Sequence, residues 1–160
     1  LPALRSLKCI FNDALVSLSF KGLTNLSDVQ CGSNPQLSII ETGEKINVRS
    51  LSIGDCAFRS LEFINSFPLL QELSCSSNNL TSLDLSELPL LRSVDCSDNK
   101  KLVHLQIPEQ NSVNPILQNL DCSFCYLDEK ELNAIFCVLP VAPNPYPEYP
   151  SGYGLSLIHI

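Results

Sequence analysis

Cysteine and histidine are the residues of this chain with the most versatile chemistry, because they bind metals, act as nucleophiles and carry redox reactions. The 160-residue sequence holds eight cysteines and two histidines. Cys122 and Cys125 form a Cys-x-x-Cys pair, which taken alone is typical of half a zinc site or of a redox pair. The sequence has no second Cys-x-x-Cys and no Cys/His pair, so four-ligand zinc binding is not supported. We therefore predict neither a metal nor a cofactor.

The cysteines instead follow a regular spacing. Five occupy one position of a repeating pattern and two occupy a second position: Cys9, Cys31, Cys75, Cys96 and Cys122, then Cys56 and Cys125. Only Cys137 lies outside this scheme. The even count also allows a disulfide framework. However, side chains on adjacent parallel strands lie about 4.8 Å apart, beyond the Cβ separation of about 3.8 Å that a disulfide favours. We predict buried, reduced cysteines that pack in a core.

Other catalytic signals are weak. His104 lies between Val103 and Leu105, where it is expected to face solvent, and His159 belongs to the last few residues. The sequence contains no Gly-x-Ser-x-Gly elbow, phosphate-binding glycine loop or His-Glu-x-x-His helix. Asp95 and Asp121 occupy equivalent repeat positions, which would pair two carboxylates on an open face. We interpret them as part of a solvated acidic surface, with weak cation binding as an alternative, and predict that the chain is not an enzyme and has no catalytic residues.

These residues are positioned by a repeat of about 22 residues. The aligned apolar positions are Leu7, Val29, Leu51, Leu73, Val94 and Leu120, which are separated by 22, 22, 22, 21 and 26 residues. Two residues after each of these lies the main cysteine position, which Ile53 occupies in one copy. Three residues further on lies an asparagine in four copies and a cysteine, Cys56 or Cys125, in the other two. In Leu-x-Cys the first and third side chains share one face, which predicts a short strand with both pointing inward. Stacked coils would pair these strands into a parallel sheet, and the asparagines would satisfy backbone groups at each bend.

The clearest copy runs from Leu70 to Ser86 and reads L-x-x-L-x-C-x-x-N-x-L-T-x-L-D-L-S. It resembles the leucine-rich repeats of secreted and surface proteins from Bacteroides-like bacteria, and the resemblance covers residues 1–139. The resemblance implies a solenoid with a short parallel sheet on its concave side and an extended or irregular return side. It also implies an extracellular or cell-surface location, although this chain shows no signal peptide.

The two ends depart from the repeat. Leu132, Ile135, Phe136 and Leu139 follow helical spacing behind Asp128, which predicts a capping helix over residues 129–139. This helix would close a leucine-rich-repeat domain of six coils over residues 1–139. Residues 140–160 are a separate region, with a proline-rich loop over 140–150. Residues 153–160 read as one more strand or as an artificial end. Leu1 begins within a coil, so we expect further sequence upstream.

The composition limits the possible partners. A net charge of −7 disfavours nucleic acid and anionic membranes, and no apolar run is long enough to span a membrane. We predict a recognition module that binds a protein or a glycan through the outward strand residues. The alternative is a structural stalk, or a fragment of a larger effector or enzyme. The candidate binding face consists of Lys8, Asp28, Gln30, Glu72, Ser74, Asp95, Asn119 and Asp121.

Overall fold

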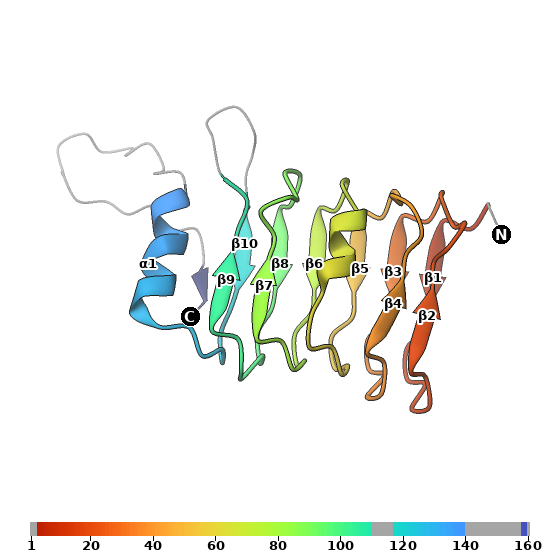
Figure 1. The fold of residues 1–160 in the computed structure, drawn as a ribbon, viewed down its shortest axis with the longest axis horizontal. Helices are drawn as coiled ribbons and strands as arrows, with labels where there is room; N and C mark the ends of the chain where they lie inside the picture. The colour runs from red at the N-terminus through yellow and green to blue at the C-terminus, as the bar shows by residue number, and fades with distance from the viewer. Residues whose placement is uncertain (1–2, 110–116, 140–157, 160) are drawn as a thin grey trace.

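The protein is a rod of stacked coils, with the amino-terminal coil at one end and a helix at the other (Figure 1). The computed structural model describes residues 3–109, 117–139 and 158–159. One long sheet runs the length of the rod, and its strands are β1 (Ser6–Lys8), β3 (Asp28–Gln30), β5 (Ser50–Ser52), β6 (Glu72–Ser74), β8 (Ser93–Asp95), β10 (Asn119–Asp121) and β11 (Ile158–His159).

The register of this sheet confirms the repeat. Every neighbouring pair is parallel, and the middle residues of the first six strands pair successively: Leu7, Val29, Leu51, Leu73, Val94 and Leu120. About five turns of the chain connect these six strands, and the architecture is a parallel β-solenoid. The middle residue is buried in five of the six strands and half-buried in β1, because β1 is the edge strand and pairs only with β3 within the described residues. Solvent exclusion from this inward row is what aligns the coils.

The return side also contains short strands. Of the predicted extended or irregular structure, two short parallel sheets supply the extended part: β2 (Ser17–Ser19) pairs with β4 (Ile39–Glu41), and β7 (Ser82–Asp84) pairs with β9 (His104–Gln106). In each of these strands the middle residue points into the core and its neighbours face outward. The same two-residue alternation that forms the main sheet therefore operates on the opposite side of the coil.

A short 3-10 helix, η1 (Glu62–Ser66), separates the two return-side sheets. Leu61, Ile64, Phe67 and Leu70 recur every third residue, and each of the last three donates its N–H to the carbonyl of the one before it at 2.8–3.0 Å. Side chains three apart stack on one side of a 3-10 helix, so all four are buried together. Phe63 also packs against Phe67, with ring centroids 6.0 Å apart.

Asparagine side chains close the bends after the main strands, as predicted. Asn78 is the clearest case: its amide donates to the carbonyls of Ile53 at 2.9 Å and Cys75 at 3.0 Å, and its Oδ1 accepts from the N–H of Phe58 at 3.0 Å. Buried Asn34 and Asn99 make equivalent contacts. Each asparagine thus joins its own coil to the preceding one.

Cysteine replaces asparagine in this row at two bends. The Cys56 thiol donates to the carbonyls of Gly54 at 3.4 Å and Cys31 at 3.5 Å. The Cys125 thiol donates to the carbonyl of Cys96 at 3.3 Å. The substitution is tolerated because a thiol supplies one weak donor in a similar volume.

The carboxy-terminal helix α1 (Glu129–Val138) covers the last coil. Asp128 caps it by accepting a hydrogen bond from the N–H of Glu131 at 2.9 Å. Ile135 is buried, while Leu132 and Leu139 pack partly buried against the core. The predicted helix and its cap are therefore confirmed. The predicted terminal strand is confirmed for residues 158–159, which pair with β10, whereas the predicted proline-rich loop over 140–150 lies outside the described residues.

Candidate binding surface

The structure brings all eight predicted surface residues onto one face of the long sheet. They occupy two in-register rows, formed by the first and the third residue of each strand. The first row holds Asp28, Glu72 and Asn119, and the third row holds Lys8, Gln30, Ser74, Asp95 and Asp121. We call this face, which includes Ser50, Ser52 and Ser93, the strand face. In Figure 1 it lies behind the return-side strands.

Two neighbouring carboxylates on the strand face share the same local geometry. Asp95 accepts hydrogen bonds from the N–H of Ser97 at 3.1 Å and from its hydroxyl at 2.6 Å. Asp121, its partner in the next strand, accepts from the N–H and the hydroxyl of Ser123. The Asp-x-Ser spacing produces this turn because a short carboxylate reaches the backbone two residues on. Both carboxylates are therefore held in fixed and parallel orientations.

Serine hydroxyls also contact the other acidic side chains of the strand face. The hydroxyl of Ser27 donates to Asp28 at 2.7 Å, and that of Ser50 donates to Glu72 at 3.2 Å. Glu72 and Asp28 are exposed, while Asp95 and Asp121 are half-buried. The sequence prediction identified these carboxylates but missed their serine partners. The abundance of Ser next to or opposite each acidic position was the available signal.

Two glycines, Gly32 and Gly54, leave no room for side chains beside the third row of the strand face. A Cβ placed on Gly32 would lie 3.0 Å from the carbonyl oxygen of Gly54, and one placed on Gly54 would lie 3.1 Å from the Ser76 hydroxyl. Both positions lie two residues after the end of a strand. Larger side chains would force the coils apart, so this part of the surface is flat and built from backbone atoms.

Two hollows among the described residues lie off the strand face. One, of about 380 Å³, is lined by polar and charged residues at the bends: Ser77, Asn78, Asn79, Asp98, Lys100 and Lys101. The other, of about 650 Å³, lies at the first coil and is lined by Cys9, Asn12, Asp13, Ala14, Leu15 and Leu18. The sequence prediction did not single out either hollow, because both are made by bends and not by strands.

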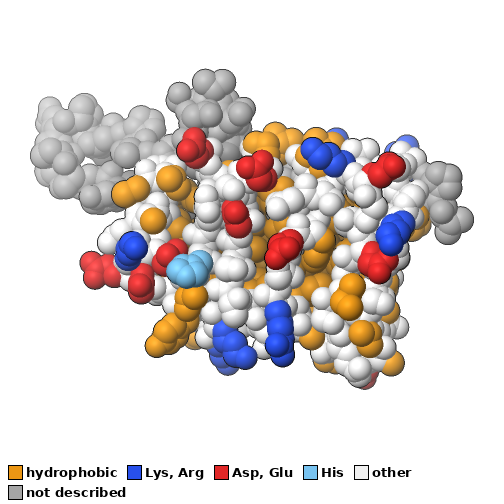
Figure 2. Space-filling view, viewed as in Figure 1, with side chains coloured by type: hydrophobic (Ala, Val, Ile, Leu, Met, Phe, Trp, Pro, Cys, Tyr) orange, Lys and Arg blue, Asp and Glu red, His pale blue; other side chains and the backbone are white. Residues whose placement is uncertain are grey.

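The return face carries a mixed surface. Figure 2 shows acidic and basic side chains scattered over it, with apolar side chains between them. Val16, Ile39 and Val103 are exposed apolar residues in or beside the return-side strands. Charges of both signs are interspersed there, so this face offers no strongly charged patch comparable to the acidic strand face.

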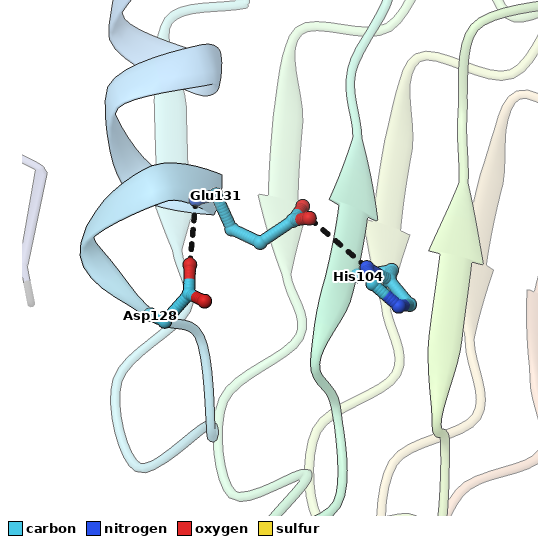
Figure 3. Close-up of polar contacts among 3 residues, drawn as sticks. All are labelled: His104, Asp128 and Glu131. Carbon is cyan, nitrogen blue, oxygen red and sulfur yellow. Dashed lines mark hydrogen bonds and ion pairs between the residues drawn. The ribbon is translucent and has the colours of Figure 1, made fainter.

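His104 has a partner that the sequence did not indicate. Its side chain is 71% exposed, as predicted, and its Nδ1 lies 3.0 Å from Glu131 Oε1 of the capping helix (Figure 3). The same Glu131 donates its backbone N–H to Asp128. This contact attaches the first turn of α1 to β9, and we assign it a structural role.

Five of the eight cysteines have the burial predicted for core residues, whereas Cys9 and Cys125 are half-buried and Cys137, which lies outside the repeat, is exposed. The five are Cys31, Cys56, Cys75, Cys96 and Cys122, and all eight cysteines are free thiols. Burial raises the pKa of Cys75, and it raises the pKa of Cys122 to about 11. The hydrogen bond between Cys96 and Cys125 raises the pKa of Cys96 and lowers that of Cys125.

Within the parts of the chain that the structure describes, no group of three or more His, Cys, Asp or Glu side chains could hold a metal ion. The described residues also include no helix long and apolar enough to cross a membrane. Fold and surface together define the chain as a parallel β-solenoid with an acidic, serine-rich strand face. No protein-family model matches the chain, and no curated protein matches it.

Proposed function

We propose that the chain is a leucine-rich-repeat recognition module of a secreted or cell-surface bacterial protein, and that it binds a protein or a glycan through the strand face without catalysing a reaction. The observation that carries this proposal is the presence of all eight predicted residues in two aligned rows of one sheet. Rows of polar groups at a fixed spacing can bind an extended partner whose hydrogen-bonding groups recur at a similar spacing.

The charge of the strand face indicates the chemistry of the partner. Asp28, Glu72, Asp95 and Asp121 contribute four carboxylates, and Lys8 is the single cation among the eight residues. Asp95 and Asp121 each keep one carboxylate oxygen outside the Asp-x-Ser turn. That of Asp95 accepts a long contact from the Ser74 hydroxyl at 3.5 Å, and both oxygens can accept further hydrogen bonds. A basic protein segment or the hydroxyl groups of a sugar would supply matching donors.

The size of the strand face limits the affinity. Strands of three residues cover about 10 Å and six of them span about 25–30 Å, which gives roughly 300 Å². A standard protein interface buries about 800 Å² on each partner. We therefore expect weak binding by this face alone, strengthened when the partner also reaches the bends or when several copies bind together.

A spacer role is the second candidate. Aromatic and Arg side chains usually supply the strongest interface contacts, and the strand face is composed mainly of Ser and acidic residues. A rod with mixed charge on its return face and small polar residues on its strand face would hold other domains apart without binding a ligand. A fragment of a larger effector or enzyme would look the same.

Binding to a glycan array and to solubilised cell-surface proteins tests the proposal. The recognition role predicts a bound partner whose capture is lost in the Asp95→Lys/Asp121→Lys variant. The matched control is Asp84→Lys/Glu87→Lys, which makes the same charge change on the return side. Asp84 also accepts the N–H of a serine two residues on, Ser86, so it resembles the tested positions. Equal loss in both variants, or no partner at all, would favour the spacer.

A further inference from the structure

Two thiols at the first turn of the solenoid lie unusually close together. The Sγ atoms of Cys9 and Cys31 are 2.9 Å apart. This separation is shorter than the roughly 3.5–4.0 Å at which non-bonded carbon atoms pack, and longer than the roughly 2.05 Å of a disulfide bond. Only a small movement of the side chains separates this contact from a covalent bond.

The backbone already has a spacing that a disulfide accepts. Lys8 pairs with Gln30 in the sheet, so Cys9 and Cys31 are the next residues along two neighbouring strands. Their N–H groups continue the ladder, with Cys9 donating to Gln30 at 2.9 Å and Cys31 to Ser52 at 2.8 Å. Adjacent strands lie about 4.8 Å apart, inside the Cα range of about 4.4–6.8 Å that is found for disulfides.

We propose that Cys9 and Cys31 are a modification site, at which a low-molecular-weight disulfide oxidises the two thiols to a cross-strand disulfide. The site is independent of the binding function proposed above. It also revises the expectation from sequence that neighbouring thiols lie too far apart for a disulfide, because the two Sγ atoms are closer together than the strand spacing indicates.

The reaction is an ordinary thiol–disulfide exchange. The Cys9 sulfur attacks one sulfur of the small disulfide, which forms a mixed disulfide, releases one small thiolate and gives up the Cys9 proton. The Cys31 sulfur then attacks the Cys9 sulfur, the mixed disulfide breaks, and the second small thiolate leaves with the Cys31 proton. The protein loses two electrons and two protons, and the small disulfide is reduced to two thiols.

Accessibility decides which thiol reacts first. Cys9 is half-buried and lines the hollow of about 650 Å³ at the first coil, so a small reagent can reach it. Cys31 is fully buried, and burial together with the neighbouring Cys9 thiol raises its pKa. Cys31 is therefore a poor first nucleophile and is placed to resolve a mixed disulfide on Cys9.

The other cysteines of the same row provide an internal control. Cys75 and Cys96 are also equivalent residues of neighbouring strands, following the paired residues Ser74 and Asp95. The Cys96 thiol instead donates to the carbonyl of Asp121 at 3.3 Å, away from Cys75. Ile53 separates this group from Cys31 in the row. Between equivalent residues of neighbouring strands, a disulfide should therefore form at the first turn and not between Cys75 and Cys96. The contact of Cys96 with Cys125 and the exposed Cys137 are separate sites that the experiment must distinguish from it.

Peptide mapping of the full chain tests the proposal. The reduced, folded protein is incubated with oxidised glutathione, quenched with acid and digested without reductant. We expect one linked peptide pair joining Cys9 to Cys31, and the same pair in the Cys75→Ser/Cys96→Ser variant. The Cys31→Val variant should retain glutathione on Cys9, because the resolving thiol is gone. A persistent glutathione adduct on Cys9 of the wild type, a different cysteine pair, or no oxidation at all would overturn the proposal.

Thermal unfolding provides a second readout. The bond would close a loop between residues 22 apart in sequence, which restricts the unfolded chain. In the chain-entropy account this raises the melting temperature of a domain of this size by about 5–10 °C. Oxidised wild type should gain this increase over the reduced form, whereas Cys9→Ser treated in the same way should not. A linked protein that melts at the same temperature or lower would contradict the geometry argued here.

Discussion

The asparagine row gives the sharpest prediction about stability. In Asn78→Ala the side-chain amide disappears while the backbone groups that it contacts stay buried. Those groups are the carbonyls of Ile53, Cys75 and Ser76, at 2.9, 3.0 and 3.2 Å, and the N–H of Phe58 at 3.0 Å. The side-chain amide can donate two hydrogen bonds and its oxygen accepts one here, so the substitution removes three full hydrogen bonds.

The magnitude follows from the burial of those groups. Each lost bond at a buried group costs about 1–1.5 kcal/mol, so Asn78→Ala should lower the free energy of unfolding by about 3–5 kcal/mol. That is a large part of the roughly 5–15 kcal/mol that stabilises a typical domain. Asn12→Ala is the matched control, because Asn12 occupies the same repeat position but is exposed and its amide donates only to the Ile10 carbonyl at 3.0 Å. It should cost at most about 1 kcal/mol.

Urea unfolding followed by circular dichroism measures both free energies. Asn78→Asp adds a further check, since it retains an acceptor for Phe58 but places a carboxylate against carbonyl oxygens, and it should be at least as destabilising as Asn78→Ala. If Asn78→Ala and Asn12→Ala lost the same free energy, the role assigned to the asparagine row would be refuted.

Three further predictions concern the core, the cap and the thiols. Leu73→Ala should lower the free energy of unfolding by about 2–5 kcal/mol in the same urea assay, because Leu73 is buried in the middle of the inward row, and the half-buried Leu7→Ala should cost less. Asp128→Ala should cost about 0.5–2 kcal/mol and speed hydrogen exchange in the first turn of α1, whereas an unchanged exchange rate would contradict its capping role. The contribution of the Cys122 thiol to stability should be constant well below pH 9 and fall as the pH rises toward 11 and beyond, because Cys122 keeps its proton in the folded state up to a pKa of about 11 while the unfolded thiol ionises near 9.0. The lowered pKa of Cys125 opposes this trend, but the raised pKa values of Cys31, Cys56, Cys75 and Cys96 reinforce it. In Cys75→Val the alkaline loss of stability, measured as the shift in urea midpoint between pH 8 and pH 10, should be smaller than in the wild type, and an equal loss would contradict the effect of burial on that thiol.

The main sheet could be predicted from the sequence because its signal is repeated. Leu73 and Cys75 are two residues apart and lie one repeat from Leu51 and Ile53, so inward positions recur both along a strand and between coils. A single copy would have been ambiguous between strand and helix. Repetition fixes both the period and the register, since a slip by one residue would expose the whole inward row.

The return side was harder to predict because its pattern changes between coils. Leu83 and Leu105 follow the two-residue alternation of strands, and they lie in β7 and β9. Leu61, Ile64 and Phe67 follow a three-residue spacing within the 3-10 helix, but Leu85, Leu88 and Leu91 have the same spacing and form turns, so the spacing does not identify the helix.

The strand face was predictable as a set of positions but not as a set of contacts. Alternation within each strand placed Asp95 and Asp121 outward and side by side, and the sheet register agrees. The serine contacts of those carboxylates, the pairing of His104 with Glu131 and the short distance between Cys9 and Cys31 depend on side-chain rotamers and on packing between distant segments. Spacing in the sequence carries no information about those angles.

The register of the inward row is the central claim, and nuclear Overhauser effects between backbone protons test it most directly. In a parallel sheet of adjacent coils, the residues flanking Leu51 should show cross-strand effects to those flanking Val29 and Leu73, and the chain of contacts should continue through Val94 to Leu120. Observation of this unbroken sequence of neighbours is the predicted result. Effects that instead join these residues to unrelated segments, or to each other in antiparallel order, would contradict the solenoid and the binding face built on it.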